Sequence, residues 1–135
     1  MQDFTLDPRI AADSLEVRDL ELSAVRLMRD ANYPWLLLLP RRDGLAEIVD
    51  LTPEERTLLM AEIGLASAAL RAVVRCDKLN VAALGNVVRQ LHVHVIARTI
   101  GDAAWPRPVW GAAESKAYPA GEAETLAAAI AARLS

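Results

Sequence analysis

The two histidines of this chain, His92 and His94, are the residues best suited to chemistry, because they lie only two positions apart. In the segment from Gln90 to Ile96, an apolar residue follows each polar one, and side chains on a strand alternate between its two faces. The pattern therefore predicts a strand that presents Gln90, His92 and His94 on one face. A histidine can act as a nucleophile, as an acid or base near neutral pH, or as a metal ligand.

One reaction open to such a pair is attack on phosphorus by a neutral imidazole nitrogen. The other ring nitrogen must then be held by an acceptor, such as a backbone carbonyl, which fixes the tautomer. The product is a phosphohistidine that water or another acceptor resolves. Asn86, Gln90, His94 and the backbone amides near Gly85 are candidate donors for the charged phosphate oxygens. This scheme requires no metal or other cofactor.

Size and composition predict one globular domain over residues 1–135. The chain is 53% hydrophobic and has a net charge of −3, so neither a nucleic-acid polymer nor a membrane is an expected partner. A small phosphorylated ligand is compatible with this charge because ligand sites are local. The N-terminus lacks the basic region and apolar run of a signal peptide, and Cys76 is the single cysteine. The cytoplasm is therefore the expected compartment.

The spacing of apolar residues predicts an α+β fold with a largely antiparallel sheet, one long helix and a C-terminal helix. Gly85 and Asn86 are expected to turn two strands into a hairpin. Residues 101–121, which contain Trp105 and Trp110, are expected to form an ordered loop. The expected strands are 21–28, 35–39, 78–84 and 87–99, and the expected helices are a short helix or turn at 10–15, a long helix at 53–75 and a final helix at 122–134.

The long helix has the clearest start signal. Thr52 offers an N-cap hydroxyl, Pro53 is suited to the first helical position, and Glu55 stands where a capping box needs a carboxylate. Apolar side chains then recur at spacings of four and three residues, which predicts one buried stripe. The stripe consists of Leu59, Ile63, Ala66, Leu70 and Val73.

Four segments, taken together, resemble the histidine triad (HIT) superfamily. Its signature is His-φ-His-φ-His-φ-φ, where φ is apolar, and the chain matches it from position 90 with glutamine in place of the first histidine. Gly85-Asn86-Val87 is similar to the family's Gly-Gln-Ser or Gly-Gln-Thr. Trp35 to Arg41 resembles the family's His-x-Leu-Val-x-Pro-Lys/Arg strand, and Leu51 to Glu55 its Leu-Thr/Ser-x-Glu-Glu helix start. The resemblance covers about residues 20–100, with the segments in the family's order.

The resemblance implies a HIT-like fold and a nucleotide hydrolase or nucleotidyl transferase. The implied substrates are dinucleoside polyphosphates, such as diadenosine tetraphosphate, or nucleoside phosphoramidates. His92 would be the nucleophile on the α-phosphorus, His94 would contact phosphate or the leaving group, and Gln90 would support them. Asp30 or Asn32 would meet the ribose. Many members are homodimers, so a homodimer is expected. The implied phosphate-binding residues are Asn80, Gly85, Asn86, Val87 and Arg98.

Three departures from the family pattern affect the expected choice of substrate and the expected rate of turnover. Gln90 can donate and accept hydrogen bonds, but it cannot serve in proton transfer. Val87 lacks a hydroxyl that many relatives carry, and Trp35 replaces a further histidine. All three changes leave His92 in place.

Other interpretations of the histidine pair stay open on the sequence alone. Both rings could be structural, and a His-x-His pair also occurs in metal sites, where Cys76 or a carboxylate would have to supply a third ligand. The pocket could also bind a nucleotide without turnover, as a sensor or interaction module. Loss of turnover with retained binding in His92→Ala indicates an enzyme, unchanged basal activity indicates the binding module, and sensitivity to a chelator indicates a metal site.

Overall fold

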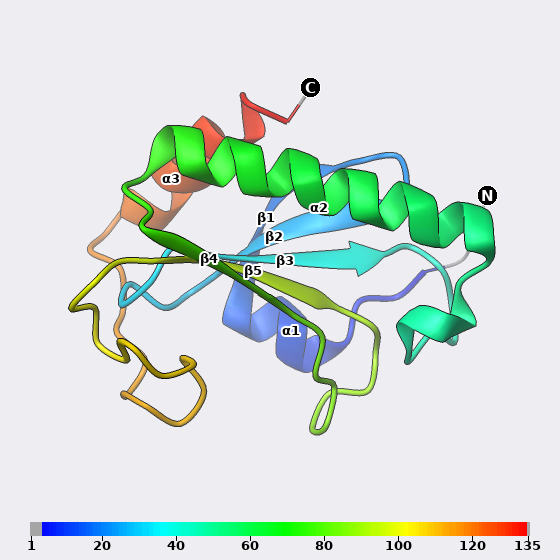
Figure 1. Cartoon of the computed structure of the whole chain (residues 1–135), viewed down its shortest axis with the longest axis horizontal. Coiled ribbons are helices and arrows are strands. Elements are labelled where there is room, and N and C mark those ends of the chain that lie inside the picture. The colour runs from blue at the N-terminus through cyan, green and yellow to red at the C-terminus, as the bar shows by residue number, and fades with distance from the viewer. Residues whose placement is uncertain (1–3, 135) are drawn as a thin grey trace.

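One five-stranded antiparallel sheet organises the molecule (Figure 1). The structure is a computed structural model that describes residues 4–134. The prediction that the chain lacks a signal peptide depends on the first few residues, most of which lie outside the described range. The strands follow the order β1-β2-β3-β5-β4. In chain order the elements are α1 (Pro8–Asp13), β1 (Ser14–Asp19), β2 (Ser23–Met28), β3 (Trp35–Pro40), the short 3-10 helix η1 (Ile48–Asp50), α2 (Pro53–Val73), β4 (Lys78–Ala82), β5 (Val93–Arg98) and α3 (Glu122–Ala131).

The two faces of the sheet are covered by different parts of the chain. Helices α2 and α3 lie on one face, and α1 lies on the other (Figure 1). The second face also receives apolar residues of the loop that follows β5, including Ala104 and Val109. Every residue of the central strand β3 is buried, which confirms the prediction of a strand covered on both faces. The predicted α+β class with an antiparallel sheet is likewise confirmed.

Helix α2 begins as the sequence predicts. The Thr52 hydroxyl accepts a hydrogen bond from the Glu55 backbone N–H at 3.1 Å, and the Glu55 carboxylate accepts one from the Thr52 N–H at 2.9 Å. On its buried stripe, Leu59, Ala66 and Leu70 are enclosed, while the other two predicted members are partly buried.

The predicted strand at 87–99 is wrong in its first half. Residues 83–92 form a loop, and β5 begins only at Val93. Two long-range contacts hold the end of this loop out of the sheet: the Leu91 N–H donates to the Leu45 carbonyl at 3.0 Å, and the Gln90 side chain bonds the N-terminal segment. The antiparallel pairing of β4 with β5 is confirmed, but a long loop connects them and not a two-residue turn.

Smaller differences concern the ends of the chain. The strand β1 was not predicted, and α3 ends at Ala131, ahead of the expected position 134. The stretch between β5 and α3 is irregular, as the sequence predicts. Within residues 4–134, none of the helices combines the length and apolar character needed to cross a membrane.

Candidate active site

His92 stands at the end of the 83–92 loop, directly before β5. Its Nδ1 atom lies 2.6 Å from the backbone carbonyl oxygen of Gln90. Because a carbonyl oxygen only accepts hydrogen bonds, Nδ1 must carry the proton in this contact. In the neutral ring, Nε2 is then the atom with the free lone pair. The backbone thus sets the tautomer that a nucleophilic histidine needs.

His94 is held in the opposite tautomer. The indole Nε1 of Trp35 lies 2.9 Å from His94 Nδ1, and an indole N–H can only donate. His94 Nδ1 therefore accepts, and in the neutral ring the proton is on Nε2. Burial, and secondarily the neighbouring His92, lower the pKa of His94 from 6.5 to about 4. His94 is consequently a neutral hydrogen-bond donor at physiological pH.

The sheet register explains how Trp35 reaches His94. Trp35 pairs directly with Ile96, which lies two residues from His94 on the same face of β5, and such diagonal neighbours are within reach of a large aromatic side chain. Trp110, from the loop after β5, packs edge-on against His94 with ring centroids 4.9 Å apart. The His92 and His94 rings are also 4.9 Å apart. His94 thus lies in an aromatic enclosure beside the ring of His92.

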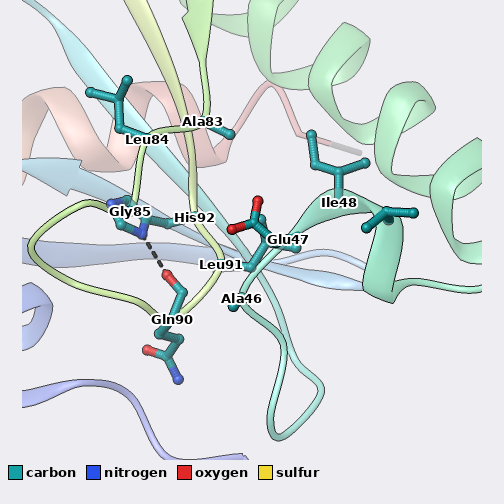
Figure 2. Close-up of a pocket in the computed structure, with 10 residues that line it drawn as sticks. Ala46, Glu47, Ile48, Ala83, Leu84, Gly85, Gln90, Leu91 and His92 are labelled. Carbon is teal, nitrogen blue, oxygen red and sulfur yellow. Dashed lines mark hydrogen bonds between the residues drawn. The ribbon is translucent and has the colours of Figure 1, made fainter.

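Two cavities flank the histidine pair. The first has a volume of about 260 Å³, and His92 forms part of its wall (Figure 2). The second has a volume of about 330 Å³ and is walled in part by Trp35 and Trp110, the two aromatic residues that contact His94. The first cavity thus adjoins His92 itself, and the second adjoins the aromatic residues around His94. The first cavity is lined by Ala46, Glu47, Ile48, Val49, Ala83, Leu84, Gly85, Gln90, Leu91 and His92.

Substitution of Trp35 tests the tautomer assignment of His94. Trp35→Phe removes the indole donor but keeps an aromatic ring, so the neutral form of His94 loses one hydrogen bond. We expect the pKa of His94 to rise by about half a unit to one unit. The measurement is an NMR titration of the ring signals, which is simplified because the chain has two histidines. An unchanged or lower pKa would contradict the assignment.

The same titration has a consequence for stability. The folded-state pKa of His94, about 4, lies below the ordinary value of 6.5, so the unfolded chain binds more protons within that window. The free energy of unfolding therefore falls as the pH falls from 6.5 towards 4. The stability that the neutral His94 contributes is fully present above pH 6.5.

The predicted site residues of the 83–92 loop are only partly brought together. Gly85 lines the first cavity and has a φ of +78°, a conformation that favours glycine. Asn86 and Val87 are exposed and do not line that cavity. The Gln90 side chain accepts from the Asp7 N–H at 2.9 Å and donates to the Thr5 carbonyl at 2.8 Å. Gln90 therefore supports His92 through its backbone carbonyl, while its side chain anchors the N-terminal segment.

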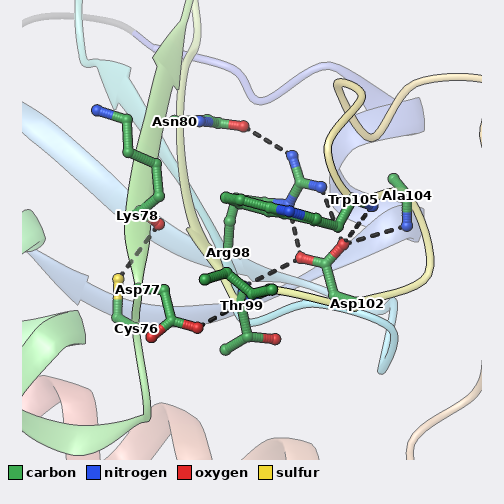
Figure 3. Close-up of polar contacts among 10 residues, drawn as sticks. Cys76, Asp77, Lys78, Asn80, Arg98, Thr99, Asp102, Ala104 and Trp105 are labelled. Atoms are coloured by element: carbon green, nitrogen blue, oxygen red, sulfur yellow. Dashed lines mark hydrogen bonds and ion pairs between the residues drawn. The ribbon is translucent and has the colours of Figure 1, made fainter.

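Arg98 and Asn80, the two expected phosphate-binding residues on β5 and β4, contact each other within the fold. The Arg98 side chain is 2% exposed and forms an ion pair with Asp102 at 2.8 Å. Two hydrogen bonds of the Arg98 guanidinium go to the Asp102 carboxylate. A third goes to the Asn80 side-chain oxygen, at 2.8 Å (Figure 3). The Arg98 guanidinium and the Asn80 side-chain oxygen are thus engaged within the fold, which favours a structural role for this pair over the expected phosphate contacts.

The two residues expected near a ribose are tied to the loop that precedes α3. The Asp30 carboxylate accepts hydrogen bonds from the Asn32 N–H at 3.0 Å and the Lys116 N–H at 3.2 Å. The Asn32 side chain donates to the Glu114 carbonyl at 2.7 Å. Of the two, only Asp30 lines the second cavity.

A metal site at the histidine pair would need a third ligand. Among residues 4–134, no three His, Cys, Asp or Glu side chains gather as a metal site requires.

Comparison with known proteins places this arrangement in a family. Residues 10–100 match the model of the HIT domain. The chain belongs to the HIT family. A histidine triad protein from Bradyrhizobium japonicum is 49% identical, with 98% of each chain covered and a TM-score of 0.95. One from Sinorhizobium meliloti is 45% identical, with 97% of each chain covered and a TM-score of 0.93.

More distant proteins share the HIT fold. A hypothetical histidine triad nucleotide-binding protein from Sulfolobus tokodaii is 19% identical, with 90% of this chain and 83% of that chain covered and a TM-score of 0.69. No curated protein matches the chain. The predicted membership of the superfamily is therefore confirmed by the family model and by the solved structures.

Two contacts of this HIT site depend on tertiary structure. The sequence identifies Trp35 as a replacement for a histidine, but the bond of Trp35 to His94 depends on strand register, which the sequence does not state. Trp110 belongs to the predicted ordered loop, and its contact with His94 depends on the path of that loop, which no local pattern fixes. The sequence signal for this contact is the tendency of tryptophan to find a packing partner.

Proposed function

We propose that this HIT protein is a nucleotide hydrolase or nucleotidyl transferase that acts on the α-phosphate of its substrate through a covalent adduct on His92. The observation that carries this proposal is the contact between His92 Nδ1 and the Gln90 carbonyl at 2.6 Å. It leaves the Nε2 lone pair of the neutral ring available for attack at the edge of a cavity. Dinucleoside polyphosphates and nucleoside phosphoramidates are the proposed substrate classes.

The proposed reaction has two steps. His92 Nε2 forms a bond to the α-phosphorus while the bond from phosphorus to the leaving group breaks, and the leaving group keeps the electron pair. Water then attacks the same phosphorus, the bond to Nε2 breaks, and the nucleotide leaves with the water oxygen. In a transferase, a different acceptor replaces this water. The neutral His94 donates a hydrogen bond from Nε2 to the charge that develops on the phosphate or the leaving group.

The second cavity is the proposed seat of the nucleoside. Its walls include the aromatic rings of Trp35 and Trp110 and the carboxylate of Asp30. Aromatic walls suit a flat base, and a carboxylate suits ribose hydroxyls. The Sulfolobus tokodaii protein of the same fold, which is named a nucleotide-binding protein, is consistent with a nucleotide as ligand.

Trapping the adduct tests the proposal. The protein is incubated with diadenosine tetraphosphate or an adenosine phosphoramidate, denatured at alkaline pH, where phosphohistidine persists, and digested for mass spectrometry. We expect the mass of one adenylate on the peptide that contains His92 and none in His92→Ala. Turnover by the wild type with no adduct on His92, and with undiminished activity in His92→Ala, would refute the mechanism.

A second candidate function is nucleotide binding without turnover. It is favoured by the Gln90 side chain, which is engaged by Thr5 and Asp7 and is not free to assist a reaction. In that case, isothermal titration detects nucleotide binding to the wild type, while the trapping experiment yields no adduct and no product.

We also propose a homodimer. Strand β4 lies at an edge of the sheet, where unpaired backbone groups can join another strand, and Val81 on this strand is 49% exposed. Sedimentation velocity measures the mass directly, and a monomer at micromolar concentration would contradict the proposal.

A further inference from the structure

We propose that the side chain of Gln90 and residues 5–9 form an N-terminal clamp that positions the His92 ring for attack on phosphorus. Gln90 is a positioning residue in this assignment, because it acts on the ring through its own backbone carbonyl. The inference rests on the proposed function, since it concerns the atom that forms the bond to phosphorus. It also gives a role to the glutamine that stands at the first position of the histidine motif.

The peptide group between Gln90 and Leu91 is bonded at both ends. Its carbonyl oxygen lies 2.6 Å from His92 Nδ1, and its N–H, which belongs to Leu91, donates to the Leu45 carbonyl at 3.0 Å. In a trans peptide these two groups point in opposite directions. The two bonds therefore lie roughly along one axis, and they leave the peptide plane free to turn about it. A contact away from this axis is needed to fix the carbonyl against the ring.

The Gln90 side chain supplies that contact. Its amide oxygen accepts from the Asp7 N–H at 2.9 Å, and its amide nitrogen donates to the Thr5 carbonyl at 2.8 Å. The two partners flank Leu6, so the amide binds residues 5–7 as a residue of a neighbouring parallel strand would. Figure 2 shows the amide pointing away from the His92 ring, to which the backbone carbonyl is bonded. Gln90 thus connects the N-terminal segment to the ring.

The N-terminal segment is itself held against the fold. Phe4 and Leu6 pack against the apolar cluster that contains Trp35, the residue bonded to His94. The Arg9 guanidinium donates to the Val87 carbonyl at 3.4 Å, which joins the segment to the 83–92 loop at a second point. The segment can therefore serve as a fixed support for this loop.

Glutamine suits the clamp better than histidine does. A primary amide presents an N–H and an oxygen lone pair side by side. Neutral imidazole also has one donor and one acceptor, but its two nitrogens point in divergent directions. A histidine at position 90 can keep one of the two bonds to the segment and not both. Gln90→His should therefore loosen the clamp, although it restores the full HIT signature.

Substitutions at both ends of the clamp test it in the full chain. Gln90→Ala removes both side-chain bonds, and Gln90→His leaves one. Asp7→Pro removes the N–H that donates to Gln90, at a φ of −56° that proline adopts. Asp7→Ala removes the same carboxylate but keeps the N–H, so the difference between these two variants isolates the bond. The control is Thr125→Ala, which loses an exposed side-chain bond to the Gly121 carbonyl at 3.0 Å in α3.

Two readouts are measured for each variant. The first is kcat and KM with an adenosine phosphoramidate, and the second is the pair of ring nitrogen signals of His92 by NMR at alkaline pH, where imidazole is neutral. We expect Gln90→Ala, Gln90→His and Asp7→Pro to lower kcat by about three- to fivefold with KM changed less than about twofold, the effect of one weakened hydrogen bond. The Nδ1 and Nε2 signals should move closer together as the ring samples both tautomers.

The matched variants show whether the effect passes through the clamp. Asp7→Pro should lose at least about twofold more kcat than Asp7→Ala, and Thr125→Ala should retain both readouts. The double variant Gln90→Ala, Asp7→Pro should be no slower than Gln90→Ala, because both changes break the same bond. A loss of stability alone would not shift the tautomer signals of His92.

The outcomes separate this inference from the proposed function. Turnover that depends on His92, with kcat and ring signals unchanged in Gln90→Ala and Asp7→Pro, overturns the clamp alone. A higher kcat in Gln90→His than in the wild type overturns it as well. Absence of turnover by the wild type refutes the proposed function, whereas the ring signals, which need no substrate, still decide whether the clamp holds His92.

Discussion

Replacement of His92 by alanine is expected to lower turnover by about a thousandfold or more, because it removes the atom that forms the bond to phosphorus. His92 is 9% exposed, so truncation also removes packing, and the free energy of unfolding of the variant is measured alongside turnover to separate the two effects. Nucleotide affinity should change by less than about threefold, since the proposed contacts of the nucleoside lie in the other cavity. Steady-state kinetics and calorimetric titration with a nucleoside monophosphate provide the two measurements.

Two comparison variants sharpen this prediction. Gln90→Ala keeps the backbone carbonyl that binds His92 Nδ1 and should therefore reduce turnover by less than about tenfold. His92→Gly leaves space in a cavity of about 260 Å³, where added imidazole can stand in for the missing ring and restore part of the activity. An equal loss in Gln90→Ala, or activity in His92→Ala close to that of the wild type, would contradict the assignment of the nucleophile.

The features that the sequence predicts best are those with local causes. Helix α2 is predicted with its start because Thr52, Pro53 and Glu55 satisfy the first backbone N–H groups within a few residues. Strand β3 is predicted because a continuous apolar run needs cover on both faces. The proximity of His92 to His94 is predicted because both lie within the short segment from Gln90 to Ile96.

Other features depend on contacts between positions that are distant in the sequence. The alternation of polar and apolar residues cannot reveal such contacts. Residues 87–92 alternate much as a strand does, but bonds from Gln90 to Thr5 and Asp7 hold the end of this segment in a loop. Arg98 looks like a phosphate ligand by its position after the motif, yet its charge is used by Asp102. A buried arginine and a free one have the same sequence signature, so the resemblance alone could not separate them.

Loss of the Asp102 carboxylate is expected to be strongly destabilising. Arg98 donates to both of its oxygens, at 2.8 and 2.9 Å, and the backbone N–H groups of Thr99, Ala104 and Trp105 also donate to it (Figure 3). The guanidinium bonds, followed by these backbone donors, lower the pKa of Asp102 from 3.8 to about 2. Asp102→Ala leaves Arg98, which is 1% exposed, as an unpaired buried charge. Breaking such a pair costs about 3–5 kcal/mol, measured as the free energy of unfolding in urea.

The exposed pair of Arg41 with Asp19 supplies the matched control. Its atoms are 3.5 Å apart, and the Asp19 side chain is 58% exposed, so Asp19→Ala should cost less than about 1 kcal/mol. The pH dependence gives an independent check: because the pKa of Asp102 is lowered in the folded state, its contribution is present above pH 3.8 and is lost as the pH falls towards about 2. The double variant Arg98→Met, Asp102→Leu should regain much of the stability, since it removes both charges together. Equal losses in Asp102→Ala and Asp19→Ala would mean that the buried charge is compensated by the aromatic rings of Tyr33 and Trp105, whose centroids lie 5.5 and 5.6 Å from the Arg98 guanidinium carbon.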